Sequence, residues 1–354
     1  MPTVQEAKER LDSIVRKARV DMYKPIQIAE VLRRSRIQKD IQILKQDTYQ
    51  NPSIHWRNKV TRRLIGKVST SSANYQHDIW NQKAMPPDLL AVLDHENKRT
   101  NGGVEYYIYL RFSERQNTVA SVITFIETSL PENFDLSELL IKFTSQSEIR
   151  RSVDKAYEIV VYSLFETIVN ALETTVKVSI PVKNTNLLAE FSDLTKVLLG
   201  LELGSNSWEV PAHIYRVGVT NAADRGLDMW ANFGAAIQVK HLTLNQERAQ
   251  SITNQVESDN VVIVCRDADA RVIETIANQI SWGSRVRGIV KESELIDWYE
   301  RCLRGKFSKQ LSKALLERLV YGFKSEFPQA STISDFLSER NYSSLPIDEV
   351  WTLT

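Results

Sequence analysis

Several residue types are scarce in this 354-residue chain, and each scarcity excludes a class of protein. Two cysteines, Cys265 and Cys302, are too few for a disulfide framework, and with only 5 histidines they do not form a four-ligand zinc site. No apolar run approaches the roughly 18 residues that span a bilayer, and the N-terminus lacks the basic-then-apolar layout of a signal peptide. We therefore expect a cytoplasmic protein that does not associate with membranes.

Glycine is also scarce, with 12 residues, which favours a helix-rich chain with few long loops. The sequence has no Gly-x4-Gly-Lys-Ser/Thr loop and no dinucleotide-binding fingerprint, so nothing indicates a nucleotide-driven motor. With 42% apolar and 25% charged residues the composition is that of an ordinary globular protein, and the length suits about two domains.

The net charge of +1 conceals an uneven distribution of charge. Residues 1–67 contain 16 Lys and Arg against 7 Asp and Glu, an excess of +9, which leaves an excess of −8 for the rest of the chain. A basic end on an otherwise acidic protein is typical of a protein that binds a polyanion such as DNA. A solvated helical face rich in Lys and Arg is the plainer alternative.

The first part of the chain has mainly helical patterning. Apolar residues at spacings of three and four predict helices over residues 3–46, interrupted at Pro25, and a basic helix around Trp56–Ile65. A Tyr-rich stretch at Val104–Phe112 has no clear period. We predict a basic, helical DNA-recognition domain over residues 1–145.

A small loop rich in hydroxyl groups, Gly66–Ala73, directly follows the predicted basic helix. Its hydroxyl and backbone N–H groups suit contacts with phosphates, although a plain turn that caps the next helix remains an alternative. The predicted DNA contacts are Lys24, Arg62, Arg63, Ser69, Thr70, Ser71 and Arg225.

From about residue 147 the pattern changes to alternating helices and strands. A long apolar helix is predicted over Ile149–Glu173, then a strand over Thr174–Ile180 and a Leu-rich helical insertion over Leu187–Leu201. The later predicted strands are His213–Val219, Gly226–Trp230, Ala236–Leu242, Val261–Cys265 and Val286–Val290, and the later predicted helices are Leu244–Glu257, Ala268–Ser281 and Glu292–Leu303. Val-rich runs between helices are typical of buried strands in an α/β sheet. We predict an α/β domain over residues 146–305 and a helical tail over residues 306–354.

The densest group of chemically useful side chains lies in a predicted β-hairpin. Asp228 lies on its first strand, and Gln238 and Lys240 are two residues apart on its second, so they share a face while Val239 faces the other way. A charged Lys240 in a segment built to be buried needs an acidic partner or an anionic ligand. A cross-strand salt bridge between Lys240 and Asp228, without a metal, is the structural alternative.

These residue types fit the metal-assisted hydrolysis of a phosphodiester. The Asp228 carboxylate is a hard oxygen ligand suited to Mg²⁺, and the Gln238 side chain and the Val239 carbonyl can add further oxygens. Lys240 can hold the attacking water and offset negative charge that develops on phosphorus. The hairpin therefore predicts a magnesium-dependent nuclease site.

The pattern Asp-x9-Gln-x-Lys on two adjacent strands resembles the PD-(D/E)XK nuclease superfamily, with Gln238 in place of the usual acidic residue. Glutamine there also occurs in the Mrr-like branch, whose Asp-x-Gly-x-Asp approach is similar to Asp224-x-Gly226-x-Asp228. The resemblance implies a mixed sheet flanked by helices. It also implies a glutamate on the preceding helix, for which Glu158 is the candidate catalytic and metal-binding residue and Glu166 the alternative.

Longer segments resemble the HaeII family of type II restriction endonucleases. They are Lys17–Glu30, Val68–Ala73, Glu158–Tyr162 and Arg216–Trp230, and the similarity runs to about Phe327. The resemblance implies Mg²⁺-dependent double-strand cleavage at a short palindrome, purine-GCGC-pyrimidine, by a homodimer, with a cognate DNA methyltransferase as functional partner. Two alternatives stay open: an Mrr-like nuclease acting on modified or branched DNA, and a DNA-binding protein whose nuclease core is inactive.

Overall fold

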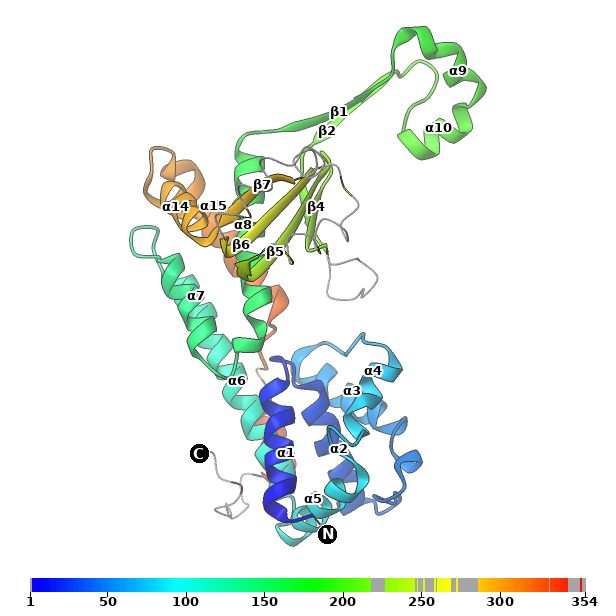
Figure 1. Ribbon diagram of the computed structural model, residues 1–354, viewed down its shortest axis with the longest axis vertical. Coiled ribbons are helices and arrows are strands. Elements are labelled where there is room, and N and C mark those ends of the chain that lie inside the picture. The colour runs from blue at the N-terminus through cyan, green and yellow to red at the C-terminus, as the bar shows by residue number, and fades with distance from the viewer. Residues whose placement is uncertain are drawn as a thin grey trace. The chain divides into compact units, whose positions relative to one another are not determined.

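The computed structural model describes residues 2–217, 227–245, 247, 251, 258, 260–268, 272, 286–330, 332–342 and 351. The chain divides into two compact units (Figure 1). The helical unit comprises Met1–Thr128, Ser137–Ala156 and Val320–Thr354, and the sheet unit comprises Ser129–Leu136 and Tyr157–Leu319. The predicted domain boundaries at residues 145 and 305 stay a prediction.

Helices make up the described part of the helical unit. Their bounds are α1 (Val4–Lys17), α2 (Tyr23–Ile37), η1 (Gln46–Thr48), α3 (Pro52–Ile65), α4 (Ala73–His77), η2 (Asp78–Trp80), α5 (Pro87–Arg99), α6 (Gly103–Thr128), α7 (Leu136–Ser145), η3 (Arg150–Ser152) and α16 (Ile333–Glu339). Local signals explain several ends. Thr3 and Glu6 form a capping box at the start of α1, and Gly66, with φ of 68°, ends α3 in the left-handed conformation.

Two expectations for this part of the chain were wrong in detail. Pro25 does not interrupt a helix but lies in the first turn of α2, where its missing N–H group costs no hydrogen bond. Val104–Phe112 is the first half of the 26-residue helix α6. Its side chains Tyr107, Ile108 and Tyr109 are all buried, and burial on several sides of a helix removes the amphipathic period that sequence analysis relies on.

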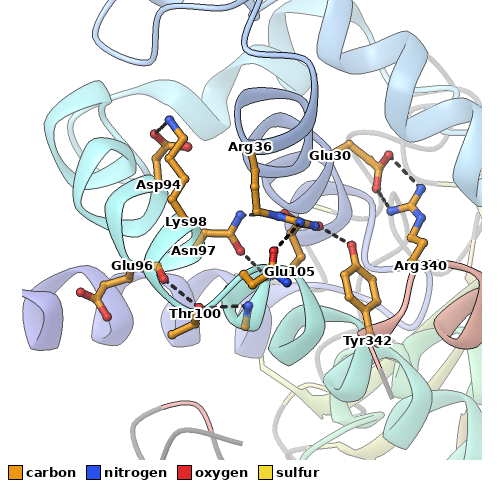
Figure 2. Close-up of polar contacts among 12 residues, drawn as sticks. Glu30, Arg36, Asp94, Glu96, Asn97, Lys98, Thr100, Glu105, Arg340 and Tyr342 are labelled. Carbon is orange, nitrogen blue, oxygen red and sulfur yellow. Dashed lines mark hydrogen bonds and ion pairs between the residues drawn. The ribbon is translucent and has the colours of Figure 1, made fainter. Parts of the chain in front are cut away.

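A buried polar network connects distant segments of the helical unit (Figure 2). The guanidinium of Arg36 donates to both carboxylate oxygens of Glu105, at 2.9 and 3.0 Å, and Asn97 and Tyr342 donate to the same carboxylate. Arg340 forms a second buried pair with Glu30. These pairs fix the segment around α16 against α2 and α6.

The described part of the sheet unit contains a mixed sheet and most of helix α8 (Val153–Ala171). The first turn of α8 belongs to the helical unit. The other bounds are β1 (Thr175–Ser179), η4 (Val182–Asn184), α9 (Thr185–Glu190), α10 (Ser192–Leu199), β2 (Ser207–Pro211), β3 (Ile214–Arg216), β4 (Met229–Ala231), β5 (Ala235–Leu244), β6 (Asn260–Ala268), β7 (Val286–Lys291), α14 (Glu292–Arg304) and α15 (Ser308–Glu326). The five-stranded sheet has the order β3-β4-β5-β6-β7. Its β3-β4 and β4-β5 pairs are antiparallel and its β5-β6 and β6-β7 pairs are parallel. The predicted mixed α/β architecture is confirmed.

The first predicted strand does not join this sheet. Residues of the predicted strand Thr174–Ile180 form β1, which pairs with β2 in a separate two-stranded ribbon. Thr175 lies opposite Pro211 at one end of this ribbon, and Ser179 lies opposite Ser207 at the other. Its alternating exposure explains the difference, because a half-exposed strand needs a partner but no buried central position. The edge position of the main sheet belongs to β3 instead.

The two faces of the main sheet are distinguished by the pairing register. Ala236, Val261, Ile263 and Cys265 belong to one apolar cluster on one face, whereas Ile237 lies on the other face with its partner Met229. Cys265 is buried and its pKa is raised to about 11 by burial, as expected for a core thiol. No helix among the described residues combines the length and the apolarity that crossing a membrane requires.

Candidate active site

The β4-β5 hairpin brings Asp228 and Gln238 into direct contact. Asp228 directly precedes β4, whose chain then turns through Gly234, with φ of 92°, into β5. The Asp228 N–H donates to the Ile237 carbonyl at 3.3 Å, so the pairing of the two strands extends to this residue. The predicted hairpin therefore forms and places the carboxylate beside the middle of β5.

One oxygen of the Asp228 carboxylate accepts two hydrogen bonds from β5. The Gln238 side-chain amide donates to Oδ2 at 2.6 Å, and the Val239 backbone N–H donates to the same atom at 2.7 Å. Gln238 is 2% exposed. A buried amide bound to a carboxylate is held in one orientation, because breaking the contact would leave polar atoms without partners.

Lys240 lies one pleat further along β5. Strand alternation puts its side chain on the same face as Gln238, and Lys240 pairs with Cys265 of β6 while Gln238 pairs with Ile263. Lys240 is partly exposed, so its ammonium is reachable from solvent. His241, the next residue, has its ring 6.4 Å from that of Tyr157 on α8.

Glu158 reaches the sheet through a residue that sequence reasoning did not single out. Its carboxylate lies 3.6 Å from the guanidinium of Arg216, the last residue of β3, and Glu158 is 5% exposed. Arg216 pairs with Met229, which places its side chain on the face opposite Gln238 and Lys240. The next residue, Val217, donates its backbone N–H to the Asp228 carbonyl at 2.9 Å. Glu158 thus contacts Arg216, and the neighbouring Val217 contacts the backbone of Asp228.

Glu166, the alternative helical carboxylate, has different partners. Its Oε2 atom accepts the Ile214 backbone N–H at 2.8 Å, and its Oε1 atom lies 3.2 Å from Nδ1 of His213. These contacts attach the edge strand β3 to α8. Glu166 therefore performs a structural task at the start of β3, whereas Glu158 lies near its end.

The donor set suits a hard divalent cation by its chemistry. A carboxylate at Asp228, an amide oxygen at Gln238, a backbone carbonyl at Val239 and a carboxylate at Glu158 are all oxygen donors, which Mg²⁺ prefers. Among the described residues, no three or more His, Cys, Asp and Glu side chains are grouped as a metal site. The proposed donors include only two side chains of these types, Asp228 and Glu158, because the other two donors are the Gln238 amide and the Val239 backbone carbonyl.

The basic residues predicted to contact DNA differ in the partners that their side chains already have. Arg62 is exposed on α3, whereas Arg63 forms an ion pair with Glu339 at 2.6 Å. The ammonium of Lys24 lies 4.0 Å from the ring centroid of Tyr75. Arg225 lies outside the described residues. Arg62 and Lys24 are thus the candidates of this group that have no carboxylate partner in the part of the chain described.

The hydroxyl-rich loop is held by a buried guanidinium. Ser69 is partly exposed and Thr70 and Ser71 are exposed, while the Ser71 carbonyl accepts the side-chain amide of Gln76. The Gln76 carbonyl accepts Arg57 at 2.6 Å, and Arg57 is 1% exposed. Burial lowers the pKa of Arg57 to about 10. Its described partners are the side-chain oxygens of three neutral amides, so the loop is attached to a positive charge without a carboxylate counter-ion in the described chain.

Sequence reasoning also missed an exposed aromatic pair beside Asp228. Tyr215 and Trp230 are cross-strand partners whose rings stack at 4.5 Å, and they are 41% and 45% exposed. Trp230 is two residues from Asp228, so both project from the same face. The sequence signal was an aromatic residue on each of the predicted strands His213–Val219 and Gly226–Trp230, with Trp230 on the same strand face as Asp228.

The geometry is that of a candidate nuclease site, and comparison with known proteins gives the family. Residues 7–342 match the HaeII restriction endonuclease family. The chain belongs to this family. It is 46% identical to the type II restriction enzyme HaeII of Haemophilus aegyptius over 345 residues, which cover 97% of this chain and 98% of the relative.

A second member of the family is similar over nearly its whole length. The type II restriction enzyme NgoBI of Neisseria gonorrhoeae is 44% identical over 341 residues, which cover 96% of this chain and 97% of that protein. No solved structure matches the chain. Membership of the HaeII restriction endonuclease family confirms the predicted enzyme class, a site-specific endonuclease that acts on DNA.

Proposed function

We propose that this chain makes Mg²⁺-dependent double-strand cuts in DNA at a short palindrome, purine-GCGC-pyrimidine. The hydrogen-bonded pair of Asp228 and Gln238 on adjacent strands, in a family of restriction endonucleases, is the observation that carries the proposal. The target sequence rests on the family resemblance. The α/β sheet with its β4-β5 hairpin is then the core of a PD-(D/E)XK nuclease in which glutamine replaces the second acidic residue.

The proposed roles follow from the chemistry of each group. Asp228, Gln238 and the Val239 carbonyl would hold Mg²⁺, which when bound would supply positive charge near the scissile phosphate and lower the pKa of a water. Glu158, whose partner Arg216 projects from the opposite face of the sheet, would have to leave Arg216 to join them. Lys240 orients the attacking water from the same strand face as Gln238 and offsets charge on the phosphate oxygens. Asp228 is kept in position by the Val239 N–H, which does not depend on Gln238.

The replacement of an acidic residue by Gln238 has an electrostatic consequence. An amide adds an oxygen ligand but no negative charge, so the site has one charge fewer than two neighbouring carboxylates would give. Glu158 restores that charge on α8 in this proposal. Its pairing with Arg216 keeps a buried carboxylate compensated until a cation is present.

The helical unit would bind and help read the duplex. Lys24, Arg62, Arg63, Ser69, Thr70, Ser71 and Arg225 are the proposed contacts, and a homodimer would present two copies of them to the palindrome. Arg63 would have to exchange its partner Glu339 for a phosphate or a base. A cognate methyltransferase would protect the cell's own sites, and both enzymes would meet DNA in the cytoplasm.

Digestion of plasmid DNA tests the proposal directly. The purified chain is incubated with a plasmid that contains purine-GCGC-pyrimidine sites, with and without Mg²⁺, and the ends are mapped to the nucleotide. We expect cleavage of both strands only at these sites and only with the metal. Cutting at unrelated sequences, or cutting in the presence of a chelator, would refute the proposal.

Matched substrates separate the two alternatives. An Mrr-like enzyme would prefer a methylated or branched duplex that contains GCGC over the same unmodified duplex. An inactive DNA-binding protein would retard the unmodified duplex in a gel without cutting it. We expect the unmodified linear duplex to be bound and cut.

A further inference from the structure

The β1-β2 ribbon carries a folded tip whose apolar side chains are exposed. The arm tip is defined here as residues 180–206, which include α9 and α10 at the far end of the ribbon from α8 (Figure 1). Of twenty exposed large apolar side chains in the described residues, eight lie within residues 182–203. Six of them are Leu187, Phe191, Leu194, Val197, Leu198 and Leu203, which are 61%, 47%, 54%, 88%, 71% and 56% exposed.

Apolar side chains on both short helices of the arm tip are exposed. Leu187 lies on α9 and Phe191 between the two helices, and on α10 Leu194 and Leu198 are four residues apart and therefore neighbours on its surface. Leu194, Val197 and Leu198 project from one side of α10. A solvated surface helix would carry polar residues at these positions.

The exposure does not result from a missing local core. Leu201 is fully buried and Leu188 is 4% exposed, and the Trp208 indole N–H donates to the Leu199 carbonyl at 2.6 Å. Gly200, with φ of 67°, ends α10 against the Trp208 ring. The arm tip therefore has its own small core and presents a second set of apolar residues outward.

The exposed area is large enough for a stable association between proteins. From the exposed fractions, the eight side chains present on the order of 800 Å² to solvent, which is about the area that one partner contributes to an interface of standard size. Eight exposed large apolar side chains within 22 residues are a high density for a solvated segment, since singly scattered ones need no explanation.

The charges of the arm tip favour a second copy of the chain over DNA. Residues 180–206 contain Lys183 and Lys196 against Glu190, Asp193 and Glu202, and Lys196 already pairs with Glu202 at 2.8 Å. A surface that bound phosphates would have a clear excess of basic residues. Two nearly neutral identical surfaces do not repel each other, and a two-fold contact places the same apolar residues on both sides.

We propose that the arm tip is a self-complementary interface through which two copies of this chain associate, with the outward faces of α9 and α10 packed against those of the partner copy. The choice of a second copy rests in part on the proposed function, since two identical subunits read a palindrome. The apolar surface itself does not depend on that function.

The molar mass of the full chain in solution, measured by light scattering after size exclusion, tests this proposal without DNA or metal. We expect the wild type at micromolar concentration to have twice the chain mass of 40.6 kDa. The double variant Leu194→Asp with Leu198→Asp should have the mass of a single chain and an unchanged circular dichroism spectrum. Leu44→Asp is the matched control, because Leu44 is 71% exposed like Leu198 but lies in the helical unit, and it should stay dimeric.

A shortened variant covers the case in which the double variant does not fold. Ser179 and Ser207 are direct cross-strand partners, so residues 180–206 can be replaced by an Asn-Gly turn that joins them as a two-residue hairpin. This variant should be monomeric. A monomeric wild type, or a shortened variant that remains dimeric, would overturn the inference.

The two proposals can fail separately. A chain that dimerises through the arm tip but does not cut the palindrome would refute only the proposed function. A chain that cuts the palindrome and stays dimeric without the arm tip would refute only this inference.

Discussion

The side chain of Gln238 donates a 2.6 Å hydrogen bond to Oδ2 of Asp228, across the β4-β5 hairpin. In the pattern Asp-x9-Gln-x-Lys, the contact joins the carboxylate of Asp228 to Gln238, which stands where the PD-(D/E)XK pattern usually has a second acidic residue. Because the Val239 N–H binds the same oxygen, Asp228 has a fixed position that does not require a metal.

Asp228→Asn should lower the cleavage rate by at least three orders of magnitude, about 4 kcal/mol on the barrier. Asparagine has the same shape and its oxygen can still accept the Val239 N–H, so the fold should be kept while the negative charge that would hold Mg²⁺ is lost. Single-turnover cleavage of a duplex with one site measures the rate, and a gel shift without metal should show unchanged DNA binding. Cleavage within tenfold of the wild type would contradict the site assignment.

Gln238→Glu should change the response of stability to Mg²⁺. Without metal, a second carboxylate would lie within hydrogen-bond distance of Asp228 and lower the melting temperature by repulsion. With Mg²⁺, the added charge should tighten binding, so the rise in melting temperature should exceed that of the wild type. Thermal unfolding without Mg²⁺ and with about 10 mM Mg²⁺ measures both effects.

The exposed Gln310 on α15 provides the control for this substitution. Gln310→Glu adds the same charge away from the hairpin and should leave the response to Mg²⁺ as in the wild type. An equal Mg²⁺-dependent shift in Gln238→Glu and Gln310→Glu would mean that the hairpin does not hold the cation.

Lys240→Ala should abolish cutting and preserve DNA binding. Lys240 shares a strand face with Gln238, and its loss removes the cation that would orient the attacking water and offset charge on the phosphate. We expect a loss of at least a thousandfold in the single-turnover rate. Lys313→Ala on α15, where the side chain is 84% exposed, is the matched control and should cut normally. If both variants cut alike, Lys240 has no part in the chemistry.

The hairpin and most buried strands could be predicted from sequence because their signals are local. The alternation of apolar and polar residues through Gln238 and Lys240 and the apolar run at Val261–Cys265 each indicate a strand, although Gln238 on the polar face is buried as well. The turn at Gly234 is likewise encoded by a residue that tolerates positive φ. These features depend on neighbours along the chain.

The features that were missed depend on contacts between distant residues. Nothing near Arg216 in sequence indicates that Glu158, 58 positions earlier, lies 3.6 Å from it. The same holds for the first predicted strand, since β1 has a normal strand pattern and only its partner β2 reveals that it lies outside the main sheet. A strand's place in a sheet is set by tertiary packing, which periodicity does not report.

The stability of the helical unit should depend on pH through Asp21. Burial raises the pKa of this carboxyl to about 6, above its ordinary value of 3.8. The folded state therefore binds more protons than the unfolded state between about pH 4 and pH 6, and the free energy of unfolding falls as pH rises through that window. The loss is complete about one pH unit above that pKa, near pH 7, at about 2–3 kcal/mol.

Asp21→Asn removes this penalty, because asparagine keeps the polar shape without ionising. The variant should be more stable than the wild type at pH 7.5, and its advantage should shrink towards zero near pH 4. Urea unfolding at pH 7.5, 6.0 and 4.5 measures the difference, with the exposed Asp47→Asn as control. A gain in stability that does not vary with pH would rule out ionisation of Asp21 as its cause.

The pairing of Arg340 with Glu30 should stabilise the helical unit strongly only while both partners are present. The two guanidinium nitrogens contact the two carboxylate oxygens at 2.5 and 3.1 Å (Figure 2), and the Tyr109 hydroxyl donates to the same carboxylate. Glu30 is buried and the Arg340 side chain is 13% exposed, so Arg340→Met would leave a buried carboxylate uncompensated and should cost about 3–5 kcal/mol of unfolding free energy.

Adding Glu30→Gln to Arg340→Met should recover much of that loss, since a neutral amide can still accept the Tyr109 hydroxyl without a buried charge. The double variant should therefore be more stable than Arg340→Met alone, by more than about 1 kcal/mol in urea unfolding at pH 7.5. If the effects of the two substitutions add within about 0.5 kcal/mol, the pair does not act as a unit. The segment around α16 would then be attached mainly by apolar packing and not by the charged pair. One such contact is that of Phe336 with Tyr109, whose ring centroids are 4.8 Å apart.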